Sequence, residues 1–483
     1  MSSVRKSLYY SVFSKYISRF IGLASVIFIA RMLTPDELGI FAIASSLVLI
    51  ASELKSFGAD GYLIREPSID KELVSKALGV SSIISWTVGS IVLISSWSIE
   101  MFYDKPDIAP LIQILSLSFF LSPHIGIGKS LMARNFQFER LLIVDSLSQV
   151  CQLLCVVILV YLDFGYFSLG IATVLGYIVE LSLVLFFKSE LFCFKPTFSG
   201  TNFIAKFGFY VTLSNLLRKL GFTLPELMIG KIGSASEVAY FSRATGFINF
   251  VSMTINSGIR PVIAPFLADK KRQGKELSEP FLQASRFMSG LMSPVLSVAA
   301  YSSETIVVVM FGDQWLRSAP LVSILCIAAI IRSSISMSVQ TLITAGLEKP
   351  LFILELLLFI LTAVLVFLCY PFGLEAIAWA FVVIALARFL MSSVLLTRFF
   401  NLKIISIIAN QFINIAISTC CVSTLWLYEF FFPHTKLLEQ FFTIVIISGI
   451  SWVTFVYVFR HPLASEISKV VKFLISKLRY KEI

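Results

Sequence analysis

Apolar residues gather in runs of about 20 along the chain, and short polar turns separate these runs. A run of this length crosses the hydrocarbon core of a bilayer as one α-helix. The pattern therefore predicts an all-α polytopic membrane protein with about 14 transmembrane helices. The runs lie near residues 10–30, 38–57, 77–98, 108–128, 141–161, 166–187, 207–230, 238–259, 281–301, 319–343, 351–370, 374–397, 404–428 and 440–459.

Composition supports this membrane assignment and excludes several functions. Of 483 residues, 57% are hydrophobic and only 14% are charged, so no stretch remains that could build a large soluble domain. The seven Cys lack paired spacing and the three His are scattered, which predicts neither a disulfide framework nor a metal site. Without a nucleophile constellation, a Walker motif or a cofactor loop, we expect no enzyme and no cofactor.

The basic residues are distributed unevenly between alternate loops. If the N-terminus is cytoplasmic, 26 of the 39 Lys and Arg fall on the cytoplasmic side and five on the other side. This imbalance follows the positive-inside rule in consecutive loops. It predicts that both termini are cytoplasmic and accounts for the net charge of +10 without nucleic acid.

The chain also contains an internal repeat. Residues 29–42 align without a gap on residues 229–242, and the two segments share Ile, Glu and Phe in register. Further on, the FYDKP segment from Phe102 resembles the FGDQW segment from Phe311, and both continue to Ala-Pro-Leu. An offset of six helices leaves equivalent helices parallel, which is typical of transporters that alternate access between two lobes.

The repeat predicts how the chain is divided. We expect an N-terminal lobe of six helices over residues 1–188, a cytoplasmic linker over 189–206 and a second six-helix lobe over 207–400. Residues 401–483 then hold two further helices and a basic cytoplasmic tail.

Several charges fall inside the predicted spans. Each would cost about 3 kcal/mol if it faced lipid, so these side chains must face protein or water. Most of the cations lie on the first two helices of each repeat, and equivalent positions such as Arg19 and Lys219 are predicted to face one shared cavity. The candidate substrate-binding residues are Arg19, Lys219, Lys15, Arg218, Lys55 and Arg243, and Glu53 and Glu226 are candidates for ion coupling or charge pairing.

A cavity with these cations and many Ser, Thr and Asn side chains suits an anionic ligand that carries hydroxyl groups. A sugar phosphate meets both demands, because Arg and Lys bind phosphate oxygens. The alternative is that each cation pairs with a nearby acid for structural reasons only. Glu53 adjoins Lys55, and Glu226 lies two turns from Lys219, so the sequence leaves both interpretations open.

The segments RFIGLASVIFIARMLTPDELGIFA from Arg19 and LPELMIGKIGSASEVAYFS from Leu224, with the FxD…APL pairs, resemble the polysaccharide transporter family. The resemblance points to its Wzx-type flippases of the colanic acid kind, within the multidrug/oligosaccharidyl-lipid/polysaccharide superfamily. In the family pattern an Asp commonly precedes the I-G-x-x-G stretch of the seventh helix. Here Glu226 stands before Ile229 and Gly230.

The resemblance implies a flippase in the bacterial inner membrane that translocates undecaprenyl-diphosphate-linked oligosaccharide repeat units for O-antigen, capsule or exopolysaccharide synthesis. Its expected partners are this lipid-linked substrate, membrane lipids, and the polymerase and glycosyltransferases of the same pathway. An antiporter of organic cations within the same superfamily is the alternative. It is disfavoured because eight cations in the spans outnumber five acids.

Overall fold

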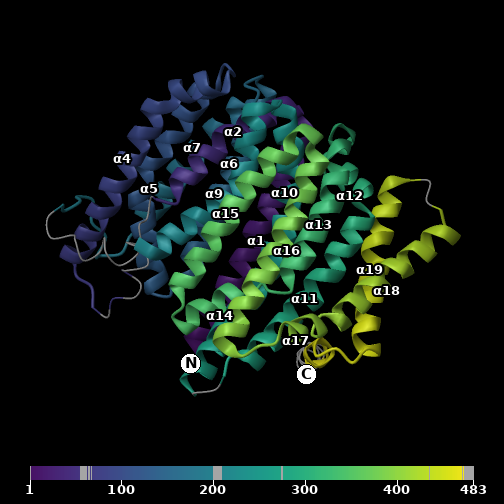
Figure 1. The fold of residues 1–483 in the computed structure, drawn as a ribbon. Coiled ribbons are helices and arrows are strands. Elements are labelled where there is room, and N and C mark those ends of the chain that lie inside the picture. Colours follow the sequence, from purple (N-terminus) through teal and green to yellow (C-terminus); the bar gives the residue numbers. More distant parts are fainter. Residues whose placement is uncertain are drawn as a thin grey trace, which may run out of the picture. The chain divides into compact units, whose positions relative to one another are not determined.

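The computed structural model describes residues 2–54, 63, 66, 68–198, 209–273, 276–433, 436–469 and 472. Every regular element in these ranges is a helix (Figure 1). Within these ranges each predicted apolar run overlaps a helix, so the predicted all-α architecture is confirmed. Ten helices in the described ranges are long and apolar enough to cross a membrane, or 11 if a bent pair is counted as one span. The count of 14 spans stays a prediction.

The chain forms two compact units. The N-terminal unit comprises Met1–Arg243 and Glu355–Pro371, and the C-terminal unit comprises Ala244–Leu354 and Phe372–Ile483. Helices α10 and α15 contribute residues to both units. The predicted lobe boundaries stay a prediction, and residues 199–206 of the predicted linker lie outside the described residues.

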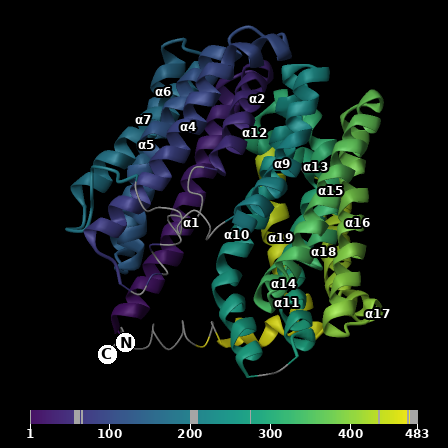
Figure 2. The same cartoon turned by 60° about the vertical axis from the view of Figure 1, so that its left-hand side comes forward.

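In the N-terminal unit, α4, α5, α6 and α7 lie side by side (Figure 2), with α1 packed on α6 and α2 packed on α5 and α9. Helices α4, α5, α6 and α7 share an apolar core that includes Val74, Leu78, Leu131 and Val184. The helices are α1 (Ser2–Met32), α2 (Pro35–Ser52), α4 (Lys71–Tyr103), α5 (Ile108–Arg134), α6 (Phe138–Tyr161), α7 (Phe167–Phe186), α9 (Phe209–Ile232) and the start of α10 (Ala235–Arg272).

In the C-terminal unit, α11 packs on α13 and α18, and α13 packs on α16. Ile417, Cys421 and Leu425 of α18 meet Ile444 and Val456 of α19 in a second apolar core. The elements are α11 (Ser278–Tyr301), α12 (Ser303–Phe311), η1 (Asp313–Ser318), α13 (Ala319–Ser333), α14 (Ser338–Ala345), α15 (Glu348–Cys369), η2 (Tyr370–Phe372), α16 (Leu374–Phe400), α17 (Ile404–Ala409), α18 (Phe412–Phe431) and α19 (Leu437–Val458).

The internal repeat has a structural signature at the starts of α2 and α10. Thr34 and Glu37 exchange side-chain-to-backbone hydrogen bonds, with the Glu37 carboxylate accepting from the Thr34 N–H at 2.8 Å. Ser234 and Glu237, 200 positions later, form the same capping box with the corresponding bond at 2.9 Å. Each box satisfies backbone donors that the first helical turn leaves without a partner. This explains why the repeat keeps Glu at both positions.

These two helix starts touch. A Cβ atom added to Gly39 of α2 would lie 1.8 Å from the carbonyl oxygen of Ala235 at the start of α10. Only glycine permits this approach, because any side chain would collide with the backbone. The capped ends of two repeat-equivalent helices are therefore held in direct contact within the N-terminal unit.

Candidate functional site

Glu226 on α9 is the centre of a polar cluster that joins three helices of the N-terminal unit. It follows Pro225 inside the helix, and only 9% of the residue is exposed. Its carboxylate accepts a hydrogen bond from the Ser46 hydroxyl of α2 at 2.5 Å and another from Ser242 of α10. A buried carboxylate needs such donors because water cannot solvate it.

Two cations lie close to this carboxylate. Arg243 follows Ser242 on α10 and interacts electrostatically with Glu226. Lys219 lies two turns before Glu226 on α9, and its Nζ is 3.8 Å from Oε1 of Glu53 at the end of α2. The Lys219 and Glu53 side chains are 26% and 31% exposed, so this ion pair remains accessible.

We call Ser46, Glu53, Lys219, Glu226, Ser242 and Arg243 the α2–α9–α10 cluster. It contains two cations and two carboxylates, and each cation has a carboxylate near it. Cations and carboxylates therefore lie close to one another at this site. The Lys219–Glu53 separation is longer than a close ion pair, so a strongly charged anion could compete with Glu53 for the ammonium group.

The structure gives less information on the other predicted site residues. Arg19 is half-buried on α1, and no hydrogen bond or ion pair within the described ranges joins it to Lys219. Arg218 is exposed on α9. Lys55 and the Lys15 side chain lie outside the described residues.

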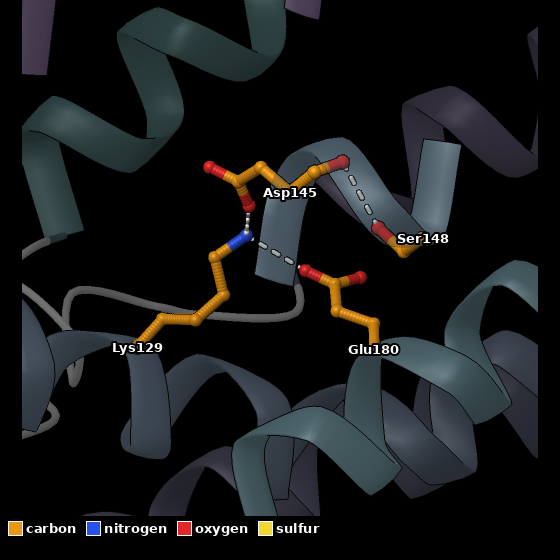
Figure 3. A network of polar contacts seen from close by, with 4 residues as sticks. All are labelled: Lys129, Asp145, Ser148 and Glu180. Carbon is orange, nitrogen blue, oxygen red and sulfur yellow. Dashed lines mark hydrogen bonds and ion pairs between the residues drawn. The ribbon is translucent and has the colours of Figure 1, made fainter. Parts of the chain in front are cut away.

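The sequence analysis missed a second charged network, which links α5, α6 and α7 (Figure 3). The Lys129 Nζ lies 2.6 Å from Asp145 Oδ1 and 2.7 Å from Glu180 Oε1. The Glu180 side chain is 17% exposed, and the other two are about one-third exposed. We call these three residues the Lys129 triad.

The triad was missed because Lys129 follows the last apolar residues of its predicted run and was assigned to a loop. In the structure it lies inside α5, within two turns of its end. Asp145 and Glu180 fall inside the predicted runs 141–161 and 166–187, and two acids inside apolar runs were the available signal. The triad carries one net negative charge and holds three helices together at one end of the unit.

No group of three or more His, Cys, Asp or Glu in the described part of the chain could hold a metal ion. The chemistry of both networks is instead that of ammonium, guanidinium, carboxylate and hydroxyl groups. These groups bind, orient and exchange anions and protons.

Sequence comparison gives the family. The family model described as "Polysaccharide biosynthesis protein" matches residues 28–320, which is more than half of the 483-residue chain. The chain belongs to this family. The match confirms the resemblance predicted from the repeat segments, and it contains the whole α2–α9–α10 cluster.

The curated relatives have low sequence identity to this chain, but the alignments cover most of its length. The lipopolysaccharide biosynthesis protein WzxC of Escherichia coli (strain K12) is 22% identical over 65% of this chain and 64% of its own length. The teichuronic acid biosynthesis protein TuaB of Bacillus subtilis (strain 168) is 21% identical over 78% of both chains. The succinoglycan biosynthesis transport protein ExoT of Rhizobium meliloti (strain 1021) is 21% identical over 68% of this chain and 66% of its own.

Solved structures show the fold. The lipid II flippase MurJ in an inward closed conformation superimposes with a TM-score of 0.75 at 14% identity, covering 95% of this chain and all of MurJ. The multidrug transporter DinF-BH of the MATE type gives a TM-score of 0.60 at 17% identity, covering 83% of this chain and 97% of that one. The chain therefore has the fold of these transporter structures, in agreement with the predicted all-α membrane architecture.

Proposed function

We propose that this protein is a flippase that moves undecaprenyl-diphosphate-linked oligosaccharide across the bacterial inner membrane for polysaccharide synthesis. The observation that carries the proposal is a charged cluster inside a membrane bundle of the polysaccharide biosynthesis family. A flippase of this kind must shelter a diphosphate and sugar hydroxyls while the lipid tail stays in hydrocarbon. The α2–α9–α10 cluster offers cations for the first group, and the partly exposed Ser242 keeps an acceptor oxygen for the second.

The names of the relatives support this substrate class. WzxC, TuaB and ExoT are named for lipopolysaccharide, teichuronic acid and succinoglycan biosynthesis, and MurJ is named a lipid II flippase. The polar portion of such a lipid is anionic and rich in hydroxyl groups. The organic-cation antiporter is supported by the shared MATE fold, whereas the names of the sequence relatives point to polysaccharide synthesis.

In the proposed mechanism, the diphosphate displaces Glu53 from Lys219, and Arg243, Arg19 and Arg218 add positive charge. Lys15 and Lys55 belong to the same proposed set. Glu226 holds Arg243 when substrate is absent, and Glu53 and Glu226 are the groups proposed to couple ions or protons. Export of negative charge is favoured by an inside-negative potential, at about 2.3 kcal/mol per charge for 100 mV.

The experiment replaces the chromosomal gene in its host and measures polymer export and the accumulation of lipid-linked repeat units. The double change Arg19→Ala with Lys219→Ala is expected to abolish export at normal membrane abundance. Lys219→Arg and Arg243→Lys are expected to retain part of it, because they keep the charge. Lys188→Ala, an exposed cation after α7, is the matched control and should export normally.

Normal export by the double alanine variant would remove both residues from the mechanism. The two function classes are separated by titrating the purified protein with a diphosphate-linked oligosaccharide and with a cationic dye. Binding of the dye alone would favour the organic-cation antiporter over the flippase.

A further inference from the structure

A pocket of about 570 Å³ opens at one end of the C-terminal unit, and none of its lining residues belongs to either charged network. It lies between the first turns of α11, the short helix α17, and the residues that follow α19. Its polar walls are formed by Glu279, Gln283, Arg286, Ser406 and Asn410, with Pro462 beside them. No part of the proposed transport mechanism uses this pocket.

Arg286 is held rigidly at the pocket wall. Its Nε donates to the Asn410 Oδ1 at 2.7 Å, and the Asn410 Nδ2 donates in turn to the Leu282 carbonyl at 2.8 Å. Asn410 is only 4% exposed, so it anchors the guanidinium from within the protein. Among the described residues, the two terminal nitrogens of Arg286 have neither a hydrogen bond nor an ion pair. The pocket therefore presents a fixed cation with unused donors.

A carboxylate stands at the other end of the same wall. Glu279 lies seven residues before Arg286 on α11, which separates their Cα atoms by about 10 Å along the helix axis. Within the described ranges, Glu279 forms no ion pair and only a 3.4 Å contact with the Gln283 amide. The two opposite charges of the pocket are thus separate from each other, and each is available to a ligand.

An apolar surface adjoins the pocket. On α17 and the start of α18, Ile405, Ile408 and Phe412 are 66%, 44% and 73% exposed. Their spacing puts them on one helical face, whereas Ser406 and Asn410 line the pocket. In a membrane bundle, such an exposed apolar face meets acyl chains. A ligand with a polar head in the pocket could therefore keep its tails on this face.

We propose that this pocket binds the headgroup of phosphatidylethanolamine, with the phosphate on Arg286 and the ammonium on Glu279 and Ser406. An arginine with free terminal N–H groups suits a phosphate, and a carboxylate with a hydroxyl suits a primary ammonium. An anionic headgroup would gain Arg286 but would be repelled by Glu279. The quaternary ammonium of phosphatidylcholine has no N–H to donate to Glu279.

The test measures lipid binding to the purified full-length protein by native mass spectrometry, with phosphatidylethanolamine, phosphatidylglycerol and phosphatidylcholine of the same acyl chains. The wild type is expected to retain phosphatidylethanolamine best. Glu279→Gln should weaken that binding about tenfold, as for one lost charge-assisted contact, and should remove the preference over phosphatidylglycerol. Glu279 is exposed, so the change leaves folding intact.

Glu276→Gln is the matched control, since Glu276 is exposed, lies three residues earlier and does not line the pocket. Arg286→Lys keeps the charge but loses the planar set of guanidinium N–H donors. It should therefore weaken the binding of all three phospholipids. Equal binding of the three lipids to the wild type would overturn the proposal. So would preferential binding of phosphatidylglycerol, or an effect of Glu276→Gln as large as that of Glu279→Gln.

Discussion

His461, just beyond α19, shows how burial controls one titratable side chain. The residue is 1% exposed, and its Nδ1 accepts a hydrogen bond from the Leu463 N–H at 3.2 Å. Its ring meets Phe287 edge-on at 6.5 Å. Burial, helped by the positive charge of Arg286, lowers the pKa of His461 from 6.5 to about 4. The folded protein therefore keeps this imidazole neutral at physiological pH.

This shift makes stability depend on pH. Between pH 6.5 and about 4 the unfolded chain binds a proton at His461 that the folded chain does not, so acidification favours unfolding. We expect the midpoint of thermal unfolding in detergent to fall over this range, and to fall less in His461→Asn. The asparagine is neutral throughout and offers an oxygen to the Leu463 N–H. Parallel pH profiles for the two proteins would contradict this prediction.

At the residue scale, the sequence identified which charges needed an explanation but could not pair them. Glu226 and Lys219 were selected because charges are costly in a bilayer, and the structure brings them into one cluster. Ser46 was not selected, because a serine inside an apolar run carries no signal. Its bond to Glu226 depends on two helices 180 residues apart in the chain.

The capping boxes give a prediction at the scale of the helix. Thr34→Ala and Ser234→Ala each remove the side chain that caps a helix, and each should lower the free energy of unfolding by about 1 kcal/mol. Ser25→Ala is the matched control, because its hydroxyl donates only to the Ile21 carbonyl of its own helix. The measurement is reversible unfolding in mixed micelles, and a cost for the control equal to that of the cap variants would contradict the prediction.

The Lys129 triad predicts an order among three substitutions. Asp145→Asn or Glu180→Gln leaves a neutral pair, whereas Lys129→Ala leaves two facing carboxylates without a cation. Because the triad is partly buried, we expect Lys129→Ala to lower the free energy of unfolding by about 2 kcal/mol and each carboxamide to cost less than about 1 kcal/mol.

Reversible unfolding in mixed micelles measures the free energy of unfolding of these three variants. Lys195→Ala, which removes an exposed cation of the same unit and keeps the backbone carbonyl that Ser75 binds, should have no effect. A carboxamide variant less stable than Lys129→Ala would show that the triad acts through its hydrogen bonds and not through its charge.

At the scale of the element, hydrophobic runs located the helices but not the breaks within them. The chain bends by 84° between α11 and α12 at Ser302, and no proline or glycine marks this position. The apolar run predicted for this span ends at Tyr301, which places the next residues in a loop. A bend between two apolar helices depends on what packs around it, which a single sequence does not encode.

The topology of the whole molecule gives another prediction. The excess of Lys and Arg in alternate loops requires residues near Asp163 to lie outside and residues near Lys195 and the C-terminus to lie in the cytoplasm. Alkaline phosphatase fused after Asp163 should be active, and fusions after Lys195 or at the C-terminus should be inactive. An active C-terminal fusion would contradict both the even number of spans and the orientation.

The contact at Gly39 determines how the two repeats fit together. The offset of 200 residues makes position 239 the counterpart of position 39. They hold Gly39 and Ala239, and Gly39 fits against Ala235 only because it has no side chain. The halves are complementary instead of interchangeable. A homodimer of the first half would place this glycine against Pro35, so it would not rebuild the same junction.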